Sequence, residues 1–566
     1  MKMSGAQIVC ESLLREGVEL VFGIPGGTIL PLYQTMVDYP QIRHILVRHE
    51  QGAAMAADGY ARATGRVGVC MATSGPGATN LVTGIANAQM DSVPLVAITG
   101  QVSRAGIGKD AFQETDVTGI TLPITKHNYL VMKAEDLASV MKEAFYIAST
   151  GRPGPVLIDI PRDVFTEVAE FEYPETADLP GYKPVLEGHP SQIKKAAKLI
   201  NEAQKPLILA GHGVIISWAY AELMELAEKA QIPVITTLLG RSSFPNDHVL
   251  FVGMPGMHGV AYASLALDEA DLIIGLGMRF DDRITGKISA FASRAKVIHV
   301  DIDPAEIDKN VRTHVPIVGD VARVLRQLNR LVESAPHPEW LDRIEELKRE
   351  HPSLHIRETD RLLPQAVIRD LCEATQGKAV IVTGVGQHQM WAAQHYSFRD
   401  KEANTFITSG GLGSMGYEVP AAMGAQLGRP DKVVWAVCGD GGFQMTMSEL
   451  ATIVENDIPV KFAIFNNNYL GMVRQWQELF YNKTYFATHR TRNPDFVKLA
   501  EAFGMPGLRV TEPGQSMSAI REAMAHPGPV LIDFLVEEEE NLYPMIPSGQ
   551  TTAELMEYPV AKEVRP

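Results

Sequence analysis

The chain has 566 residues, of which 46% are hydrophobic and 21% are charged, and its formal net charge is −16. A single hydrophobic core rarely extends beyond about 250–300 residues, so this length predicts several globular domains. The acidic balance argues against nucleic acid and anionic membranes as partners, because both bind clustered lysine and arginine, whereas anionic small molecules need only a local positive site.

The N-terminal segment, residues 1–16, predicts an amphipathic helix of a folded domain rather than a signal or transit peptide. No apolar run reaches membrane-spanning length. The four cysteines lie far apart without a Cys-x-x-Cys spacing, which favours buried, reduced thiols over disulfides or metal ligands. We therefore expect a soluble, cytoplasmic protein.

Alternating strands and helices predict an α/β fold of three doubly wound parallel-sheet domains. The first, residues 1–173, has predicted strands at 68–73 and 93–99 around a helix at 78–90. Residues 174–190, rich in proline, glycine and charge, predict a linker, and the second domain follows at 191–335 with strands at 206–210, 234–236, 272–276 and 297–300. A linker helix at 336–362 precedes the third domain, 363–566, which has strands at 380–382, 433–437 and 461–465 and ends in a lid segment.

The third domain contains a βαβ pattern with polar residues where both strands end. The strand at 433–437 leads into Cys438-Gly-Asp-Gly-Gly442, a helix is predicted at 446–455, and the strand at 461–465 leads into Asn466-Asn-Asn468. Parallel strands bring these loops to the same sheet edge, where open α/β sheets bind ligands. Glycines admit a diphosphate, and Asp440 and Asn467 each offer a hard oxygen to Mg²⁺. A lone Gly-Asp-Gly is usually a turn, but the paired loops are far more specific.

In these residues the chain resembles the thiamine-diphosphate enzyme superfamily, in which Gly-Asp-Gly is followed by Asn-Asn. The resemblance implies that Asp440, Asn467 and the Tyr469 carbonyl bind Mg²⁺. It also implies that thiamine diphosphate contacts Pro25, Gly26, Gly27, Glu50, Gly411, Gly413, Met415, Gly439, Asp440, Gly441, Gly442, Asn467, Gly471 and Met472.

A carboxylate in the first domain, Glu50, lies where a predicted strand runs into an alanine-rich helix. An acidic residue there is usually a solvated charge at a helix N-terminus. Thiamine chemistry instead requires a carboxyl that hydrogen-bonds the aminopyrimidine, so that its exocyclic nitrogen can take the proton from thiazolium C2. An apolar pocket raises the pKa of a carboxyl, as this exchange needs. The resemblance implies the second role for Glu50.

The loop Ser409-Gly-Gly-Leu-Gly-Ser-Met-Gly416 has one large apolar residue among its glycines. The resemblance implies that Met415 supports the bent form of thiamine and that the Gly413 carbonyl accepts the pyrimidine amino group. A loop methionine is otherwise only core filler. In this superfamily the domains that hold the two ends of the cofactor come from different subunits, so the resemblance implies at least a homodimer.

Longer stretches resemble one branch of this superfamily, the catalytic subunits of acetohydroxyacid synthase (acetolactate synthase). They are Ile24–Gly27, Arg48–Gly52, Thr73–Asn80, Val96–Gln101, Asp110–Glu114, Thr125–Asn128, Arg279–Lys287 and Gly471–Trp476, and the likeness covers essentially the whole chain. The resemblance implies that pyruvate is decarboxylated and its two-carbon unit transferred to a second 2-oxoacid. Pyruvate as acceptor gives 2-acetolactate and 2-oxobutyrate gives 2-aceto-2-hydroxybutyrate, in branched-chain amino-acid biosynthesis.

The second domain has a weaker dinucleotide-binding pattern: a Gly-x-Gly at 211–213 follows one strand, and Asp301 ends another, where an acid commonly holds a ribose hydroxyl. From spacing alone, the stretch from Arg279 to Lys287 fits a solvated loop as well as a pyrophosphate site. FAD-containing members of the family have this stretch, so the resemblance implies a structural FAD without a redox role. Its expected contacts are Gly211, Gly213, Thr237, Leu238, His258, Gly277, Arg279, Asp281, Arg283, Asp301, Ile302, Gly319, Asp320 and Val321.

The resemblance also implies residues for the second 2-oxoacid. Arg283 would bind its carboxylate as a planar bidentate pair, and Trp476 would pack on the ethyl group of 2-oxobutyrate. The alternative for Trp476 is an ordinary core or surface tryptophan. Gln113, Phe112 and Lys183 fall at family positions near the active-site entrance.

Two positions depart from the family pattern: Ser103 stands where many members have proline, and Glu418 stands where an apolar residue is common. Two other functions fit the same motifs, a pyruvate oxidase with redox-active FAD and a non-catalytic binding protein that retains the fold. As partners we expect 2-oxoacid substrates and a homodimer or homotetramer with active sites at the subunit interface. A small regulatory subunit accompanies many members of the family.

Overall fold

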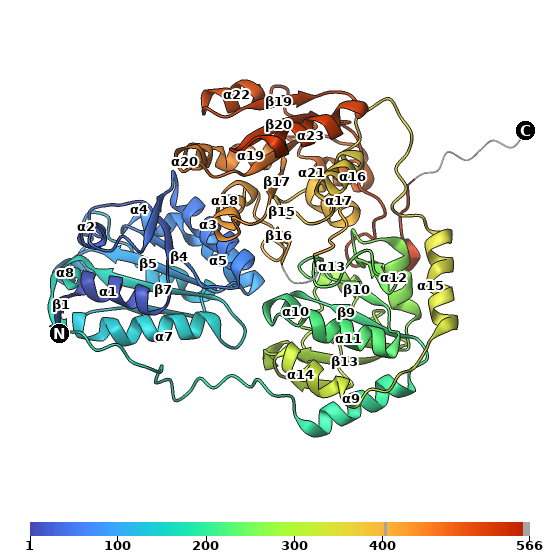
Figure 1. Cartoon of the computed structure of the whole chain (residues 1–566), viewed down its shortest axis with the longest axis horizontal. Coiled ribbons are helices and arrows are strands. Elements are labelled where there is room, and N and C mark those ends of the chain that lie inside the picture. The colour runs from blue at the N-terminus through green and yellow to red at the C-terminus, as the bar shows by residue number, and fades with distance from the viewer. Residues whose placement is uncertain (401–403, 559–566) are drawn as a thin grey trace, which may run out of the picture.

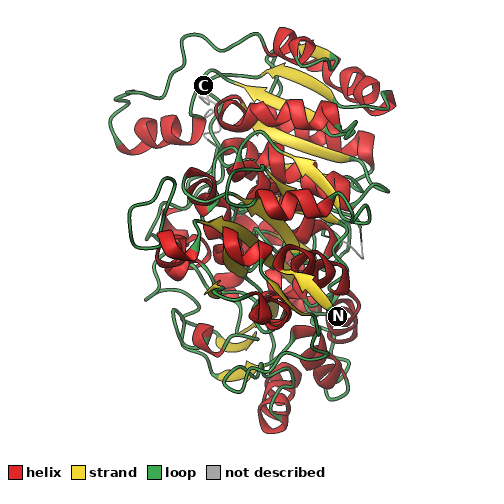
Figure 2. Ribbon diagram, turned by 90° about the vertical axis from the view of Figure 1, so that its left-hand side faces the viewer, coloured by secondary structure: helices red, strands yellow, loops and turns green. Residues whose placement is uncertain are grey.

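The computed structural model describes residues 1–400 and 404–558, so the last residues of the predicted third domain, 559–566, lie outside the described part. The described residues form three six-stranded parallel sheets and one two-stranded antiparallel pair. Helices cover the sheets (Figure 1), and Figure 2 shows them on both sides of the strands. The predicted fold of three doubly wound parallel sheets is confirmed.

The first unit has the sheet order β3-β2-β4-β5-β7-β6. Its strands are β1 (Lys2–Ser4), β2 (Leu20–Gly23), β3 (Arg43–Leu46), β4 (Gly68–Ala72), β5 (Leu95–Gln101), β6 (His127–Leu130), β7 (Pro155–Pro161) and β8 (Val168–Glu170). Its helices are α1 (Gly5–Arg15), α2 (Leu30–Met36), α3 (Glu50–Thr64), α4 (Pro76–Asn80), α5 (Val82–Asp91), α6 (Val117–Thr121), α7 (Leu137–Ser149) and α8 (Arg162–Thr166).

The structure corrects three predicted boundaries in this unit. The helix expected over 1–16 begins only at Gly5, because Ser4 and Gln7 form a capping box and the residues before it pair with β8. The helix expected over 78–90 is divided into α4 and α5. The strand expected from 93 begins after Pro94, which has no N–H for the ladder.

The second unit has the order β11-β10-β9-β12-β13-β14, the arrangement of dinucleotide-binding folds. Its strands are β9 (Pro206–Ala210), β10 (Val234–Thr236), β11 (Phe251–Gly253), β12 (Leu272–Leu276), β13 (Lys296–Asp301) and β14 (Val315–Val318). Its helices are α9 (Pro190–Glu202), α10 (His212–Ile216), α11 (Tyr220–Ala230), α12 (Ala261–Glu269), α13 (Asp282–Thr285), α14 (Val321–Asn329) and α15 (Pro338–Glu350). Helix α15 buries Trp340 in the core of this unit, where its indole N–H donates to the Pro206 carbonyl at 3.0 Å.

The third unit has the order β16-β15-β17-β18-β20-β19, the same relative order as the first. Its strands are β15 (Val380–Thr383), β16 (Phe406–Thr408), β17 (Val434–Gly439), β18 (Lys461–Asn466), β19 (Gly507–Val510) and β20 (Val530–Leu535). Its helices are α16 (Pro364–Thr375), α17 (Gln387–His395), α18 (Glu418–Gly428), α19 (Asp440–Thr446), α20 (Leu450–Glu455), α21 (Gly471–Phe480), α22 (Phe496–Ala502) and α23 (Ser516–Ala525). The single helix expected over 446–455 is replaced by α19, which begins at Asp440, a 3-10 turn at Met447–Glu449, and α20. The acidic Asp440 in the first turn of α19 complements the helix dipole.

Helices α3 and α18 join the first and third units (Figure 1). A Cβ added to Gly59 would lie 2.2 Å from the Ala421 carbonyl oxygen, and one added to Gly424 would lie 1.8 Å from that of Ala56. Only glycine permits so close a backbone approach. One buried apolar cluster therefore runs through both units, whereas the second unit has cores of its own.

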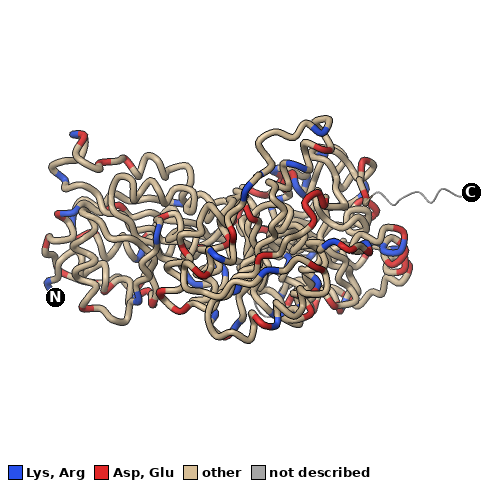
Figure 3. The backbone as a smooth tube through the Cα atoms, turned by 90° about the horizontal axis from the view of Figure 1, so that it is seen from above, with Lys and Arg blue, Asp and Glu red and all other residues tan. Residues whose placement is uncertain are grey.

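Lys and Arg positions are interspersed with Asp and Glu positions along the backbone (Figure 3). None of the helices in the described residues is long and apolar enough to cross a membrane.

Candidate active site

The polar loops predicted in the third unit lie side by side at the carboxyl edge of its sheet. Strands β17 and β18 are parallel neighbours, with Gly439 opposite Phe465, so Asp440 and Asn467 follow adjacent strand ends. Strand β15 flanks β17 on its other side, and the strand order reverses between these two. Ligands of open α/β sheets bind at such a reversal.

Asp440 is buried, and its carboxylate is held from several sides. Its Oδ2 accepts hydrogen bonds from the Asn468 N–H at 3.0 Å and from Asn493 Nδ2 at 2.7 Å, and its Oδ1 pairs with Arg490. Burial raises the pKa of Asp440, and the nearby Arg490 charge partly offsets that rise. The Tyr469 N–H donates to Asn467 Oδ1 at 3.2 Å, and Arg490 Nη2 donates both to Asp440 Oδ1 and to the Tyr469 carbonyl, the latter at 3.1 Å.

A pocket of about 70 Å³ opens beside these residues. It is lined by Met415, Gly439, Asp440, Gly441, Gly442, Asn467, Tyr469, Gly471 and Met472, all predicted to contact thiamine diphosphate or Mg²⁺. Gln387 and His388, at the start of α17, also line it, and Gln387 Oε1 and His388 Nε2 are buried without a hydrogen-bond partner among the described residues. Burial lowers the pKa of His388 to about 3, so the ring is neutral.

These two residues were missed from the sequence, although their place after β15 at the same sheet edge could have indicated them. Buried polar atoms normally have partners, so unpaired ones that line a pocket fit a polar ligand. The pocket thus offers a carboxylate, an amide oxygen and a carbonyl to a hard cation, and glycine backbone with the unpaired His388 ring nitrogen to a diphosphate, whereas the unpaired Gln387 Oε1 can only accept a hydrogen bond.

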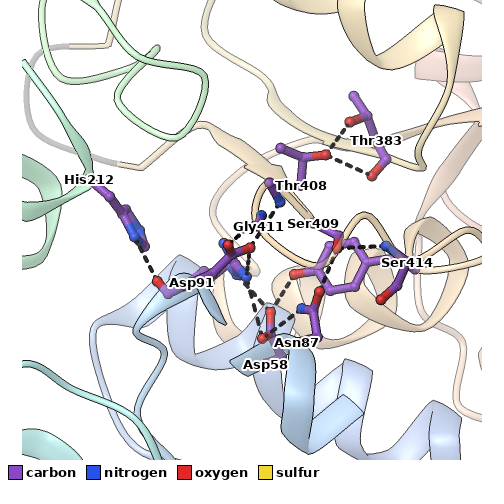
Figure 4. Close-up of polar contacts among 12 residues, drawn as sticks. Asp58, Asn87, Asp91, His212, Thr383, Thr408, Ser409, Gly411 and Ser414 are labelled. Carbon is purple, nitrogen blue, oxygen red and sulfur yellow. Dashed lines mark hydrogen bonds and ion pairs between the residues drawn. The ribbon is translucent and has the colours of Figure 1, made fainter. Parts of the chain in front are cut away.

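The loop from Ser409 to Gly416 is held by the first unit (Figure 4). The Gly410 and Gly411 N–H groups donate to the Asp91 carboxylate at 2.9 and 2.7 Å, and the Ser409 hydroxyl donates to Asn87. Gly413 has φ +73°, a left-handed conformation that glycine adopts without strain. These contacts fix the path of the loop that carries Met415.

Asp91 belongs to a buried charged network between the first and third units (Figure 4). Arg62 donates to Asp58 Oδ1 at 2.7 Å and to Asp91 Oδ2 at 2.8 Å, and the Tyr417 hydroxyl donates to Asp58. The nearby carboxylates raise the pKa of Arg62 against the effect of burial, so it keeps its charge. Removing one partner from such a buried network of charges typically lowers the free energy of unfolding by about 3–5 kcal/mol.

A second cavity, of about 720 Å³, lies among all three units, and we call it the central cavity. Twelve of the fourteen residues predicted to contact FAD line it: Gly213, Thr237, Leu238, His258, Gly277, Arg279, Asp281, Arg283, Asp301, Ile302, Asp320 and Val321. The other two, Gly211 and Gly319, do not. The chain order of the second sheet reverses between β9 and β12, and the 211–213 and 277–279 segments follow these two strands.

Charges in the central cavity come from two units. Burial raises the pKa of Asp301 to about 7, and it lowers the pKa of His258 to about 3. Arg152, from the first unit, lines the cavity and pairs with Glu306 at 2.7 Å and Asp303 at 3.2 Å. The sequence analysis did not predict Arg152 or Asp91 as cavity residues, because no local motif identifies a side chain that contacts a distant unit.

Arg283 and Trp476, the residues predicted for the second 2-oxoacid, also line the central cavity. Met415 and Gly413, predicted to contact thiamine, line it as well. The Arg283 side chain is 53% exposed, and its guanidinium Nη1 lies 3.2 Å from Met257 Sδ. Met415 and Met472 line both cavities, so the central cavity adjoins the smaller pocket there.

Predicted residues from the N-terminal part of the chain line neither cavity. These are Pro25, Gly26, Gly27, Glu50, Phe112, Gln113 and Lys183. Glu50 is half-buried and accepts a hydrogen bond from Asn80 Nδ2 at 2.9 Å, and Phe112 is 87% exposed. Within one chain, the pyrimidine half of the predicted site and the diphosphate half are not assembled into one pocket.

Three parts of the chain match known families. Residues 3–120 match "Thiamine pyrophosphate enzyme, N-terminal TPP binding domain", residues 193–328 match the central domain of these enzymes, and residues 384–534 match their C-terminal TPP binding domain. Thiamine pyrophosphate is another name for thiamine diphosphate, so the predicted cofactor agrees with both terminal domains.

Full-length relatives agree with these matches. The chain is 51% identical to an acetolactate synthase large subunit of Mycobacterium tuberculosis, over 100% of this chain and 93% of the relative. It is 50% identical to the acetolactate synthase large subunit of Corynebacterium glutamicum, over 98% of this chain and 90% of the relative. A probable acetolactate synthase large subunit of Methanocaldococcus jannaschii is 50% identical, over 97% of this chain and 94% of the relative.

Proposed function

Because the chain belongs to the family of acetolactate synthase large subunits, we propose that it decarboxylates pyruvate and transfers the remaining two-carbon unit to a second 2-oxoacid. With pyruvate as acceptor the product is 2-acetolactate, and with 2-oxobutyrate it is 2-aceto-2-hydroxybutyrate. Both products belong to the biosynthesis of valine, leucine and isoleucine. The observation that carries the proposal is that a pocket suited to a diphosphate adjoins, at Met415, a cavity with residues suited to a 2-oxoacid.

The smaller pocket is the proposed anchor for the cofactor. Asp440, Asn467 and the Tyr469 carbonyl would hold Mg²⁺, while His388, whose neutral ring can donate a hydrogen bond, would face the diphosphate. Thiamine diphosphate, when bound, would supply a carbanion at thiazolium C2 as the nucleophile for the keto carbon of pyruvate, and a cationic ring as the acceptor of the electron pair left by CO₂.

Glu50 is proposed as the group that holds the proton on the pyrimidine ring. Since Glu50 does not share a pocket with Met415 in one chain, the proposal requires a second copy of the chain to supply it. Phe112, Gln113, Lys183 and the Pro25–Gly27 turn would reach the site from the same second copy. A homodimer is therefore the smallest complete enzyme in this proposal, and a homotetramer would pair two of them.

Arg283 and Trp476 are proposed to select the second substrate. The exposed guanidinium of Arg283 can bind a carboxylate through two parallel N–H donors. The Trp476 ring in the same cavity offers an apolar surface to the ethyl group of 2-oxobutyrate. One methylene in an apolar pocket contributes only about 1–3 kcal/mol, so we expect a preference rather than exclusion of pyruvate.

The central cavity is proposed to hold FAD in a structural role. Asp301 at the end of β13 would accept a hydrogen bond from a ribose hydroxyl, and Arg279 would lie near the pyrophosphate. The net reaction has no oxidant or reductant, so these residues would only bind and orient the flavin.

The product formed from pyruvate tests the proposal. We expect 2-acetolactate and CO₂ under anaerobic conditions, with the flavin absorbance unchanged. Acetate or acetyl phosphate with flavin reduction would instead establish a pyruvate oxidase. Binding of thiamine diphosphate without turnover would establish a non-catalytic protein.

A further inference from the structure

The guanidinium of Arg490 lies within the site proposed for Mg²⁺. Its Nη2 donates to Asp440 Oδ1 and, at 3.1 Å, to the Tyr469 carbonyl oxygen. These are two of the three proposed metal ligands, so one nitrogen spans them as a shared metal ion would. A Cβ added to Gly441 would lie 2.1 Å from Arg490 Nη1, so the guanidinium also covers backbone proposed to face the diphosphate.

The backbone of Arg490 is held by contacts that do not involve its side chain. The Arg490 N–H donates to the Asn468 carbonyl at 2.8 Å, and the Leu470 N–H donates to the Thr488 carbonyl at 2.8 Å, so this segment is tied to the ligand loop. The Arg490 Nε is buried without a hydrogen-bond partner among the described residues, and the side chain is 23% exposed. The guanidinium can therefore leave Asp440 while its backbone stays in place.

Magnesium and this guanidinium compete for the same oxygens. Mg²⁺ binds oxygen at about 2.0–2.1 Å with near-octahedral geometry, which leaves no room for a second cation between the same two atoms. Asp440 keeps its orientation during an exchange, because Oδ2 is held by Asn468 and Asn493 independently of Oδ1. The only change required is at Oδ1 and at the Tyr469 carbonyl.

We propose that Arg490 is a built-in counter-ion of the metal site, which neutralises Asp440 until Mg²⁺ displaces the guanidinium. The proposal rests on the metal site assigned under the proposed function. It gives the chain a way to keep a buried carboxylate paired in both states, since an unpaired buried charge is costly. It also means that the affinity for the metal is lowered by the free energy needed to break the Arg490–Asp440 ion pair.

The test is a titration of the full-length protein with Mn²⁺, as a replacement for Mg²⁺, in the presence of thiamine diphosphate. Free Mn²⁺ is measured by its electron paramagnetic resonance signal. For Arg490→Gln we expect about tenfold tighter Mn²⁺ binding, the equivalent of one charge-assisted hydrogen bond that no longer has to be broken. The control is Arg492→Gln, an exposed neighbour with the same change of charge, which should bind as the original protein does.

Unchanged or weaker Mn²⁺ binding in Arg490→Gln would overturn the proposal, and weaker binding would identify Arg490 as a cofactor ligand instead. Arg490→Lys, which keeps the charge, should show a smaller gain and serves if the glutamine variant does not fold. Asp440→Asn separates the two levels of inference. If that variant binds Mn²⁺ normally, the assignment of the metal site is wrong. If it no longer binds Mn²⁺ and Arg490→Gln shows no gain in affinity, the metal site stands and only the counter-ion role of Arg490 is refuted.

Thermal unfolding of the cofactor-free protein gives a second readout. Arg490→Gln leaves Asp440 without its cation, so its unfolding midpoint should fall below that of the original protein and of Arg492→Gln. An unchanged midpoint would contradict a neutralising role.

Discussion

Glu418 should make the stability of this protein depend on pH, and Glu418→Gln should remove the part of that dependence that Glu418 contributes. The side chain is fully buried at the start of α18, and neither carboxyl oxygen has a hydrogen-bond partner among the described residues. A Cβ added to Gly384 would lie 2.3 Å from one of these oxygens, so no water fits between them. Burial raises the pKa of Glu418 from 4.5 to about 7.

The sign and size of the effect follow from this shift. The folded protein holds the proton up to about pH 7, whereas the unfolded chain releases it near pH 4.5, so the free energy of unfolding falls as pH rises between these values and levels off above them. Between pH 5 and pH 8 the contribution of Glu418 to the free energy of unfolding should fall by about 2–3 kcal/mol. Glutamine has nearly the same shape as glutamate and does not ionise, so the free-energy cost of burying it does not change with pH.

The measurement is urea unfolding of both proteins at several pH values, compared as the difference in free energy of unfolding. Burial also raises the pKa values of Asp159 and Asp301 to about 7. Both carboxyls titrate equally in the two proteins, so their contributions cancel in the difference in free energy of unfolding. The exposed Glu373→Gln serves as a control and should give a flat difference. A flat difference for Glu418→Gln as well would show that this carboxyl finds a partner in solution and that the reasoning from its burial is wrong.

Three further variants test the site. Asp91→Ala leaves buried Arg62 with one carboxylate instead of two, so we expect a loss of about 3–5 kcal/mol of stability by urea unfolding, and a loss below 1 kcal/mol would refute the network's importance. Glu50→Gln should reduce acetolactate formation at least 100-fold while dialysis still shows thiamine diphosphate bound, and retained activity would exclude the proton-holding role. Trp476→Leu should lower the preference for 2-oxobutyrate over pyruvate by about tenfold or less in competition assays; an unchanged product ratio would refute its role.

Local motifs predicted the parts of the site that depend on local geometry. Asp440 and Asn467 could be placed together because parallel strands deliver their carboxyl ends to one edge. The Gly-x-Gly turn and the acid at the end of β13 could be predicted to lie at one sheet edge for the same reason, whereas FAD as their ligand is implied only by the family resemblance. What these residues share is that each lies within a few residues of a strand end.

Other parts of the site depend on how distant units meet. Arg152 and Asp91 reach a cavity formed largely by other units, and Arg490 reaches Asp440 from an irregular segment after α21. Neither spacing nor composition signals such contacts. The sequence could indicate Glu50 as the carboxyl that thiamine chemistry requires. That Glu50 and Met415 do not line one cavity within a single chain depends on how the units pack, which no local motif encodes.

The close glycine contacts between α3 and α18 have a consequence for assembly. Glu50 opens α3, and the loop of Met415 leads into α18, so in the proposed dimer each chain would contribute to two different sites from a single stiff helix pair. Two copies related by a twofold axis would then complete both sites in the same association step, and no species with only one complete site would form. At protein concentrations below the dissociation constant of the dimer, the specific activity should rise in proportion to concentration rather than stay constant.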